Sequence, residues 1–170
     1  MKWHMRRPTA ALILIASLLS MPFTGPVFAD VFKDAADAIG RGDHKTAFRL
    51  LKPLAEQGNA KAQYNLGVFY QQGWVVPKDH AEAVKWYRKA ADQGEVLAQW
   101  SLGVMYQSGL GVTRDYVLSH MWYSLAAPRL SEEGRNTTIK SRDFVASKMT
   151  PAKIAEAQKL AREWRPKIKE

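Results

Sequence analysis

The sequence predicts an all-α protein, a short α-solenoid of antiparallel helix pairs, on three observations. Residues 62–70 (AQYNLGVFY) and 98–106 (AQWSLGVMY) are nearly the same and lie 36 residues apart. The match continues in register through the Ala-Ala pairs at 90–91 and 126–127. Within each copy, apolar residues recur at spacings of three and four, which is the pattern of amphipathic helices. A fixed period of this length is typical of stacked repeats, each of which buries its apolar face only against its neighbours.

The first half of each unit is predicted to be a helix, because Ala62, Leu66 and Tyr70 are spaced by four and share one face. Gly67 adjoins this face, and Gly103 holds the same place in the next unit. A glycine inside a helix costs about 1 kcal/mol relative to alanine. We expect that cost to be tolerated because it lets a tryptophan of the second helix lie against bare backbone.

The second half of each unit is predicted to be a helix that follows a glycine-containing connector. Asp79, with Glu82 three positions later, forms a capping-box pattern that marks the start of this helix. Trp86 and Tyr87 belong to its apolar face, while charged residues fill the opposite face. Gly94 suits the left-handed conformation in which many helices end.

The repeat pattern divides the chain into five parts. The part before the first full unit has a short first helix, about 31–39, and lacks the Leu-Gly-x-x-Tyr pattern, as terminal repeats often do. After residue 130 the repeat is lost, and Thr150 places a capping hydroxyl before a proline that can start a last helix. The predicted parts are a signal peptide (1–29), a degenerate unit (30–58), two full repeats (59–94 and 95–130) and C-terminal capping helices (131–170).

The first 29 residues have the pattern of a secretory signal peptide. Lys2, Arg6 and Arg7 precede an apolar run at 10–19, and the small residue Ala29 marks the expected cleavage point. The run is too short for a membrane anchor, which needs about 20 apolar residues. The chain has no cysteine, and so neither a lipid-acceptor residue nor disulfides. We expect cleavage after Ala29 and a soluble periplasmic protein, with full secretion as the alternative.

Cleavage would lower the formal charge from +9 to +6, because the removed segment holds three basic and no acidic residues. For an exported protein, this basic balance does not point to nucleic acid as a partner. It points to anionic membrane surfaces, cell-wall material or an acidic protein. The simpler alternative is a solvated basic surface that keeps the protein soluble.

The repeated residues resemble the Sel-1-like repeat family, a relative of the tetratricopeptide repeats. The shared pattern is Ala-x-x-x-Leu-Gly-x-x-Tyr, then Gly-x-Gly-Val, Asp, Ala and Trp-Tyr-x-x-Ala-Ala, over about residues 43–127. The resemblance implies an α-solenoid that serves as a scaffold for protein contacts and is often exported in bacteria. The first connector departs from the pattern, because Val75 stands where the second connector has Gly111. A β-branched residue is poorly suited to positive φ, so we expect this connector to take another path, with Trp74 docked on the repeat.

The sequence does not predict an enzyme, a cofactor or a metal site. It lacks the motifs Ser-x-x-Lys, Lys-Thr-Gly, Gly-x-Ser-x-Gly and His-Glu-x-x-His. His44 and His80 are equivalent first-turn residues of adjacent units, but a closed metal site needs more ligands. His120 is expected to be a partly buried structural histidine. Because cysteine-rich members of the family have been linked to β-lactam hydrolysis, a hydrolase or binder acting on cell-wall material is the alternative function.

The candidate binding surface is the concave groove that the first helices of the stacked pairs are expected to line. The basic and aromatic residues at 85–89 are not assigned to it, since their aromatic side chains are expected inside. Amide, hydroxyl and small apolar groups along the groove suit an extended protein or peptide segment, the alternative being a plain solvent face. The identity of the partner and the oligomeric state are not predicted. The predicted groove residues are Lys61, Asn65, Val68 and Gln72 in one unit and Leu97, Ser101, Val104 and Ser108 in the next.

Overall fold

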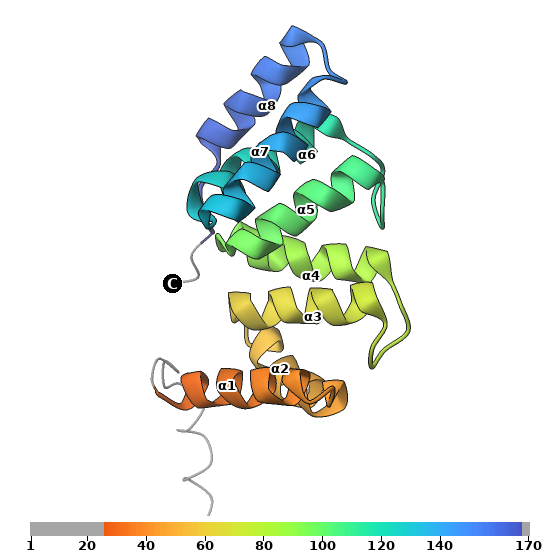
Figure 1. Ribbon diagram of the computed structural model, residues 1–170, viewed down its shortest axis with the longest axis vertical. Helices are drawn as coiled ribbons and strands as arrows, with labels where there is room; N and C mark the ends of the chain where they lie inside the picture. Colours follow the sequence, from red (N-terminus) through yellow and green to blue (C-terminus); the bar gives the residue numbers. More distant parts are fainter. Residues whose placement is uncertain (1–25, 168–170) are drawn as a thin grey trace, which may run out of the picture.

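The computed structural model describes residues 26–167, and over that range it is helical, with eight α-helices and one short 3-10 helix. Each helix from α1 to α6 packs against the next, α7 and α8 both pack on α6, and Figure 1 shows the helices stacked along the long axis. The predicted all-α solenoid is confirmed. The helices are α1 (Pro26–Gly40), α2 (His44–Glu56), α3 (Ala60–Gln72), α4 (His80–Asp92), α5 (Val96–Ser108), α6 (Tyr116–Ala126), η1 (Ala127–Arg129), α7 (Glu132–Ala146) and α8 (Pro151–Glu163).

Local sequence signals account for where the paired helices begin and end. The Asp79 carboxylate accepts a hydrogen bond of 2.9 Å from the N–H of Glu82, and Asp43 and Asp115 cap α2 and α6 in the same way. Gly73 ends α3 with a φ of 75° and Gly109 ends α5 with a φ of 72°. Glycine is needed there because other residues seldom adopt positive φ.

The small residue of each first helix lies against a tyrosine, and the predicted contact with a tryptophan is wrong. A Cβ at Gly67 would lie 2.5 Å from Cδ1 of Tyr87, and a Cβ at Gly103 would lie 2.5 Å from Cδ1 of Tyr123. Both tyrosines are buried. Trp86 cannot make this contact because it precedes Tyr87 by one position, and therefore points roughly 100° away around the helix.

The tryptophans of the second helices face different surroundings. Trp86 is half-buried against the core formed by α1, α2 and α3, and the Lys89 ammonium lies 4.0 Å from the centre of its ring. Trp122, its equivalent in the next unit, is buried, and its ring lies edge-on to that of Trp164, with 6.5 Å between centroids. The aromatic faces of α4 and α6 are therefore covered by different parts of the chain.

Each of the two full repeats has one buried glutamine that joins it to the preceding helix pair. Nε2 of Gln63 donates to the carbonyl of Ala55 at 3.1 Å, and Nε2 of Gln99 donates to the carbonyl of Ala91 at 3.4 Å. The last carbonyls of a helix have no partner within that helix. Each glutamine therefore caps the C-terminal end of the helix before it, a role that the sequence analysis did not assign to the repeated Ala-Gln pair.

The two connectors within the pairs have the same succession of turn and bend residues before the next helix, so the expected difference in their paths stays a prediction. Gly111 has a φ of 71°, and a Cβ there would overlap the backbone of His80 at the start of α4. In the first connector, the Trp74 ring stacks on the His44 ring at the start of α2, with 4.2 Å between centroids and 15° between planes. The predicted docking of Trp74 is confirmed. Each connector thus rests on the start of the preceding second helix.

The two ends of the solenoid differ from the central repeats. Helix α1 is described from Pro26, and so includes the five residues before the predicted start at residue 31. The basic residues and apolar run of the predicted signal peptide lie outside the described residues. At the other end, α7 and α8 both pack on α6, as predicted for capping helices. No helix within 26–167 is long and apolar enough to cross a membrane.

Candidate partner-binding groove

The structure distributes the eight predicted groove residues unevenly between surface and interior. In α3, Lys61 and Gln72 are exposed, while the other two predicted groove residues, Asn65 and Val68, are half-buried. In α5, the same two positions, Leu97 and Ser108, are again exposed. The exposed positions therefore lie near the starts and ends of the two helices. The remaining four residues, nearer the middle, are Asn65, Val68, Ser101 and Val104.

The prediction that Ser101 is exposed is wrong, because its exposed fraction is only 7%. Ser101 lies close to the hydroxyl of Tyr87 on the neighbouring helix α4. Burial raises the pKa of this tyrosine far above its ordinary value, and the Ser101 hydroxyl opposes that rise. Asn65, at the same position of α3, is half-buried, and its Nδ2 donates to the carbonyl of Lys61 at 2.7 Å. Ser101 is therefore part of the packing between α4 and α5.

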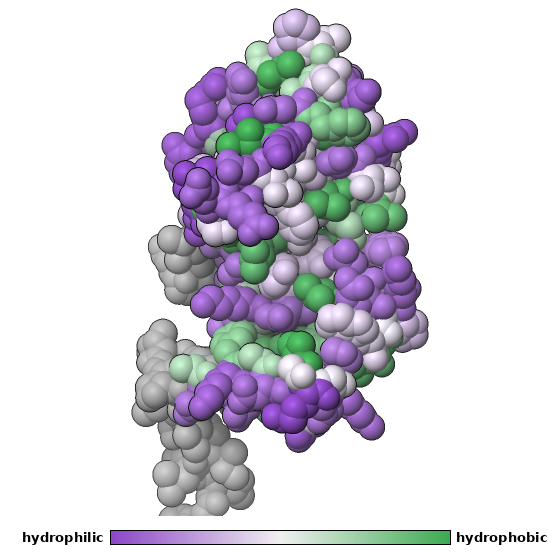
Figure 2. All heavy atoms as spheres, in the orientation of Figure 1, coloured by the Kyte–Doolittle hydropathy of each residue, from purple (hydrophilic) through white to green (hydrophobic). Residues whose placement is uncertain are grey.

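The middle of the predicted groove is partly occupied by packing contacts. Val68 packs against the core of α4 and α5, and Tyr64, one turn before it, lies 5.8 Å from Tyr87 between ring centroids. Figure 2 shows apolar residues on the viewed face as separate small patches between polar ones. Leu97 is the predicted groove residue with a large exposed apolar side chain, at 43%. The predicted groove is therefore accessible to a partner only at the starts and ends of α3 and α5.

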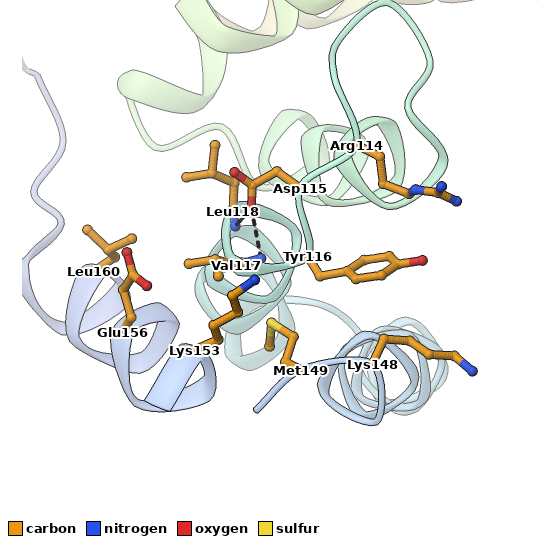
Figure 3. Close-up of a pocket in the computed structure, with 10 residues that line it drawn as sticks. All are labelled: Arg114, Asp115, Tyr116, Val117, Leu118, Lys148, Met149, Lys153, Glu156 and Leu160. Carbon is orange, nitrogen blue, oxygen red and sulfur yellow. Dashed lines mark hydrogen bonds between the residues drawn. The ribbon is translucent and has the colours of Figure 1, made fainter. Parts of the chain in front are cut away.

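A cavity of about 500 Å³ lies between the start of α6 and the turn that joins α7 to α8. Figure 3 shows Lys153 directed toward its centre, whereas Arg114 and Lys148 point away from it. Asp115 also lines the cavity, but one of its oxygens already accepts the N–H groups of α6. The other carboxylate on the wall belongs to Glu156. The basic groups therefore do not converge on one point.

A second cavity, of about 390 Å³, lies where the ends of α2 and α4 meet the start of α3. Glu56 and Trp86 are on its wall, and so is Lys167 from the segment that follows α8. A third, of about 300 Å³, lies between α6 and α7. None of the eight predicted groove residues lines any of these three cavities. Sequence reasoning missed the second cavity, because its walls come from three helices and the C-terminal segment.

His120 and His44 contact neighbouring side chains of the fold. His120 is buried in α6, and its Nδ1 lies 3.4 Å from Oγ of Ser124 one turn later. Burial lowers the pKa of His120, Arg142 of α7 lowers it further, and Asp143 of α7 opposes this. His44 is stacked on Trp74. Within residues 26–167, no three histidine, aspartate or glutamate side chains gather closely enough to hold a metal ion.

Stacked helix pairs with repeated internal contacts define a helical repeat protein of the solenoid class. The model of the Sel1 repeat matches residues 31–59, 60–95 and 96–127, which together are more than half of the chain. The chain therefore belongs to the Sel1 repeat family. Sel1 repeats generally form scaffolds for protein–protein contacts and are typically not catalytic.

Several solved structures are similar to this chain, among them two that are 32% identical to it. One is c5321, a protective antigen present in uropathogenic Escherichia coli strains that displays an SLR fold, with 32% identity and a TM-score of 0.72. That match covers 82% of this chain and 30% of c5321, so this chain spans less than a third of that protein. The other is a Sel1 repeat protein from Oxalobacter formigenes, with 32% identity, a TM-score of 0.57, and coverage of 66% of this chain and 87% of that one. No curated protein matches the chain.

Proposed function

We propose that this protein is a non-enzymatic periplasmic scaffold, which binds a protein or peptide through the exposed ends of α3 and α5. The observation that supports this most is the repetition of exposure at the same places in successive units. Lys61 and Leu97 are exposed at the starts of the two helices, and Gln72 and Ser108 at their ends. A partner segment that crosses both helices would contact equivalent exposed positions of α3 and α5. Leu97 offers it an apolar contact.

Site-specific photocrosslinking in the periplasm tests this proposal. A crosslinker at Leu97 or Gln72 is expected to capture the same partner, whereas one at Arg49, an exposed residue of α2, is expected not to. Leu97→Asp should weaken binding of the captured partner by about 1 to 2 kcal/mol, the scale of an interface contact that matters. Equal capture from Arg49, or unchanged binding of the Leu97→Asp variant, would show that the groove is not the binding surface.

A second candidate function is binding to anionic envelope material, and the formal net charge of +9 favours it. The exposed cations of α4 are less available than the composition suggests. Lys85 pairs with Glu82 at 2.7 Å, and Lys89 covers the Trp86 ring. This candidate therefore rests on Lys153. Its test is cosedimentation with anionic lipid vesicles, which Lys153→Gln should reduce mainly at low salt, where charges act over longer distances.

A further inference from the structure

The segment that follows α8 occupies a notch between the α4–α5 turn and α6. Figure 1 shows this segment running back beside that turn. The Trp164 ring lies edge-on to Trp122 of α6, with 69° between the ring planes. A Cβ at Gly94, in the turn, would lie 3.8 Å from both Trp164 and Pro166. The notch thus holds an aromatic side chain followed by a proline.

A lysine closes the filled notch. The backbone N–H of Lys167 donates to the carbonyl of Asp92 at 2.6 Å, and its ammonium lies 2.8 Å from the Asp92 carboxylate. Asp92 is the last residue of α4, where helix carbonyls lack partners and the helix dipole favours a cation. The segment therefore binds through one aromatic ring and, three residues later, through one lysine.

The same walls recur 36 residues earlier in the chain. Glu56 ends α2 at the position that Asp92 holds in α4, and Trp86 corresponds to Trp122. Glu56 and Trp86 line the cavity of about 390 Å³ between α2 and α4, where Lys89 lies over the Trp86 ring and the Asp92–Lys167 pair forms the far wall. Within residues 26–167, no backbone N–H donates to the Glu56 carbonyl, the counterpart of the carbonyl that Lys167 uses. This earlier notch therefore has the carboxylate, the carbonyl and the indole of the filled one.

The Glu56 carboxylate is available to a ligand. It pairs with Lys52 of the same helix, but both side chains are about half exposed. An exposed pair of this kind contributes little, roughly 0 to 1 kcal/mol. A lysine that also donated its backbone N–H to the Glu56 carbonyl would add a contact that Lys52 cannot make, since Lys52 lies within the helix. The notch therefore favours an incoming lysine over its present partner.

We propose that the notch between α2 and α4 binds a segment of a partner protein that carries an aromatic residue and, three positions later, a lysine. The aromatic ring would lie edge-on to Trp86, as Trp164 does to Trp122. The lysine would pair with Glu56, as Lys167 does with Asp92. This inference rests on the proposed scaffold function, but none of the predicted groove residues lines this notch.

A labelled synthetic peptide with the sequence of residues 160–167 (LAREWRPK) is the probe, titrated against the full chain by fluorescence anisotropy. The peptide is expected to bind, and replacement of its tryptophan by alanine should abolish binding. Glu56→Lys in the protein should weaken binding by at least about tenfold, which is 1.4 kcal/mol. A peptide that carries glutamate in place of its lysine should bind the Glu56→Lys variant better than it binds the unchanged protein.

Three variants serve as controls. Lys52→Gln breaks the same ion pair without changing the Glu56 carboxylate, and Glu133→Lys on α7 changes the net charge equally. Both should bind the peptide as the unchanged protein does. Leu97→Asp should also bind normally, which separates this notch from the groove. Thermal melting checks that each variant is folded, and Glu56→Gln replaces Glu56→Lys if the latter is not.

Several results would overturn the inference. One is a Glu56→Lys or Glu56→Gln variant that is folded and binds the peptide unchanged. Another is loss of binding in Asp92→Asn alone, because the peptide would then be exchanging with the protein's own segment in the later notch. Loss in Leu97→Asp but not in the Glu56 variants would assign the peptide to the groove, which overturns this inference while supporting the proposed function.

Discussion

At the scale of single residues, both full units contain the same contact between a helix glycine and a tyrosine ring, with nearly identical geometry. The three nearest ring atoms lie at the same distances from the Cβ positions at Gly67 and Gly103. Alanine would gain about 1 kcal/mol in helix propensity. Overpacking of a well-filled core costs more, about 1 to 3 kcal/mol. Steric contact therefore decides the residue, and helix propensity does not.

We expect Gly103→Ala to destabilise the protein by about 1 to 2 kcal/mol, and Gly103→Leu by more, because the buried Tyr123 ring has little room to move. Urea unfolding measures both variants. Gly40→Ala is the matched control, since a Cβ at that helical glycine would meet nothing within 4 Å. The control should be neutral or slightly more stable. Equal stability of the two Gly103 variants would disprove the argument from contact distance.

His120 should make stability depend on pH in the acid range. Burial and the nearby Arg142 hold its pKa below the ordinary value of 6.5, while Asp143 opposes the shift. The unfolded chain therefore binds the proton more readily than the folded chain. The stabilising contribution is complete above about pH 6.5 and is lost as the pH falls through the lower, folded-state pKa.

The check is urea unfolding of the unchanged protein and of His120→Gln at pH 8 and pH 5. The unchanged protein should lose more stability over this interval than the variant. Carboxylates elsewhere contribute equally to both proteins, so the difference isolates His120. The same loss in both proteins would contradict the prediction.

At the scale of helices, each second helix is held at both ends by residues of the next pair. The connector rests on its start, through Trp74 at His44 and through Gly111 at His80. A buried glutamine caps its end. Helix α6 has no further repeat after it, and α7 and α8 cover it instead. The capping helices thus replace the contacts that another repeat would make.

Trp122 tests the attachment of α8 to α6. Its side chain is buried, and Trp164 lies against it. We expect Trp122→Ala to reduce the free energy of unfolding by about 3 to 5 kcal/mol, the range for loss of a buried large aromatic. Trp74→Ala is the comparison, because Trp74 is 45% exposed and should cost clearly less. A loss below about 1 kcal/mol for Trp122→Ala would show that this packing face is wrongly assigned.

At the scale of the whole molecule, the first 29 residues predict export, and the solenoid supplies the surface that would act afterwards. We expect the mature chain to begin at Asp30 and to fractionate with soluble periplasmic material. N-terminal sequencing of the protein purified from cells checks the first point, and osmotic-shock fractionation checks the second. Recovery of the full-length chain in membranes would instead support an uncleaved anchor.

The sequence by itself determined the repeat, the helix pairs and their caps. These features depend on local rules: apolar residues spaced by three and four, aspartates before helices, and glycines at positive φ. Asp79 and Gly73 do what their residue types predict, whatever packs on the helix. The family resemblance rests on the same local pattern.

Only the tertiary structure decided which face of each helix is free. Ser101 is a small polar residue that carries no hydrophobic signal, and it is buried because α4 crosses α5 at that point. Gln99 is buried for a similar reason, as its amide reaches a helix end in the preceding unit. The notch beside Glu56 was equally hidden, since its walls come from separate helices. Periodicity reports the average apolar direction of one helix, whereas burial depends on the angles at which two neighbours cross it.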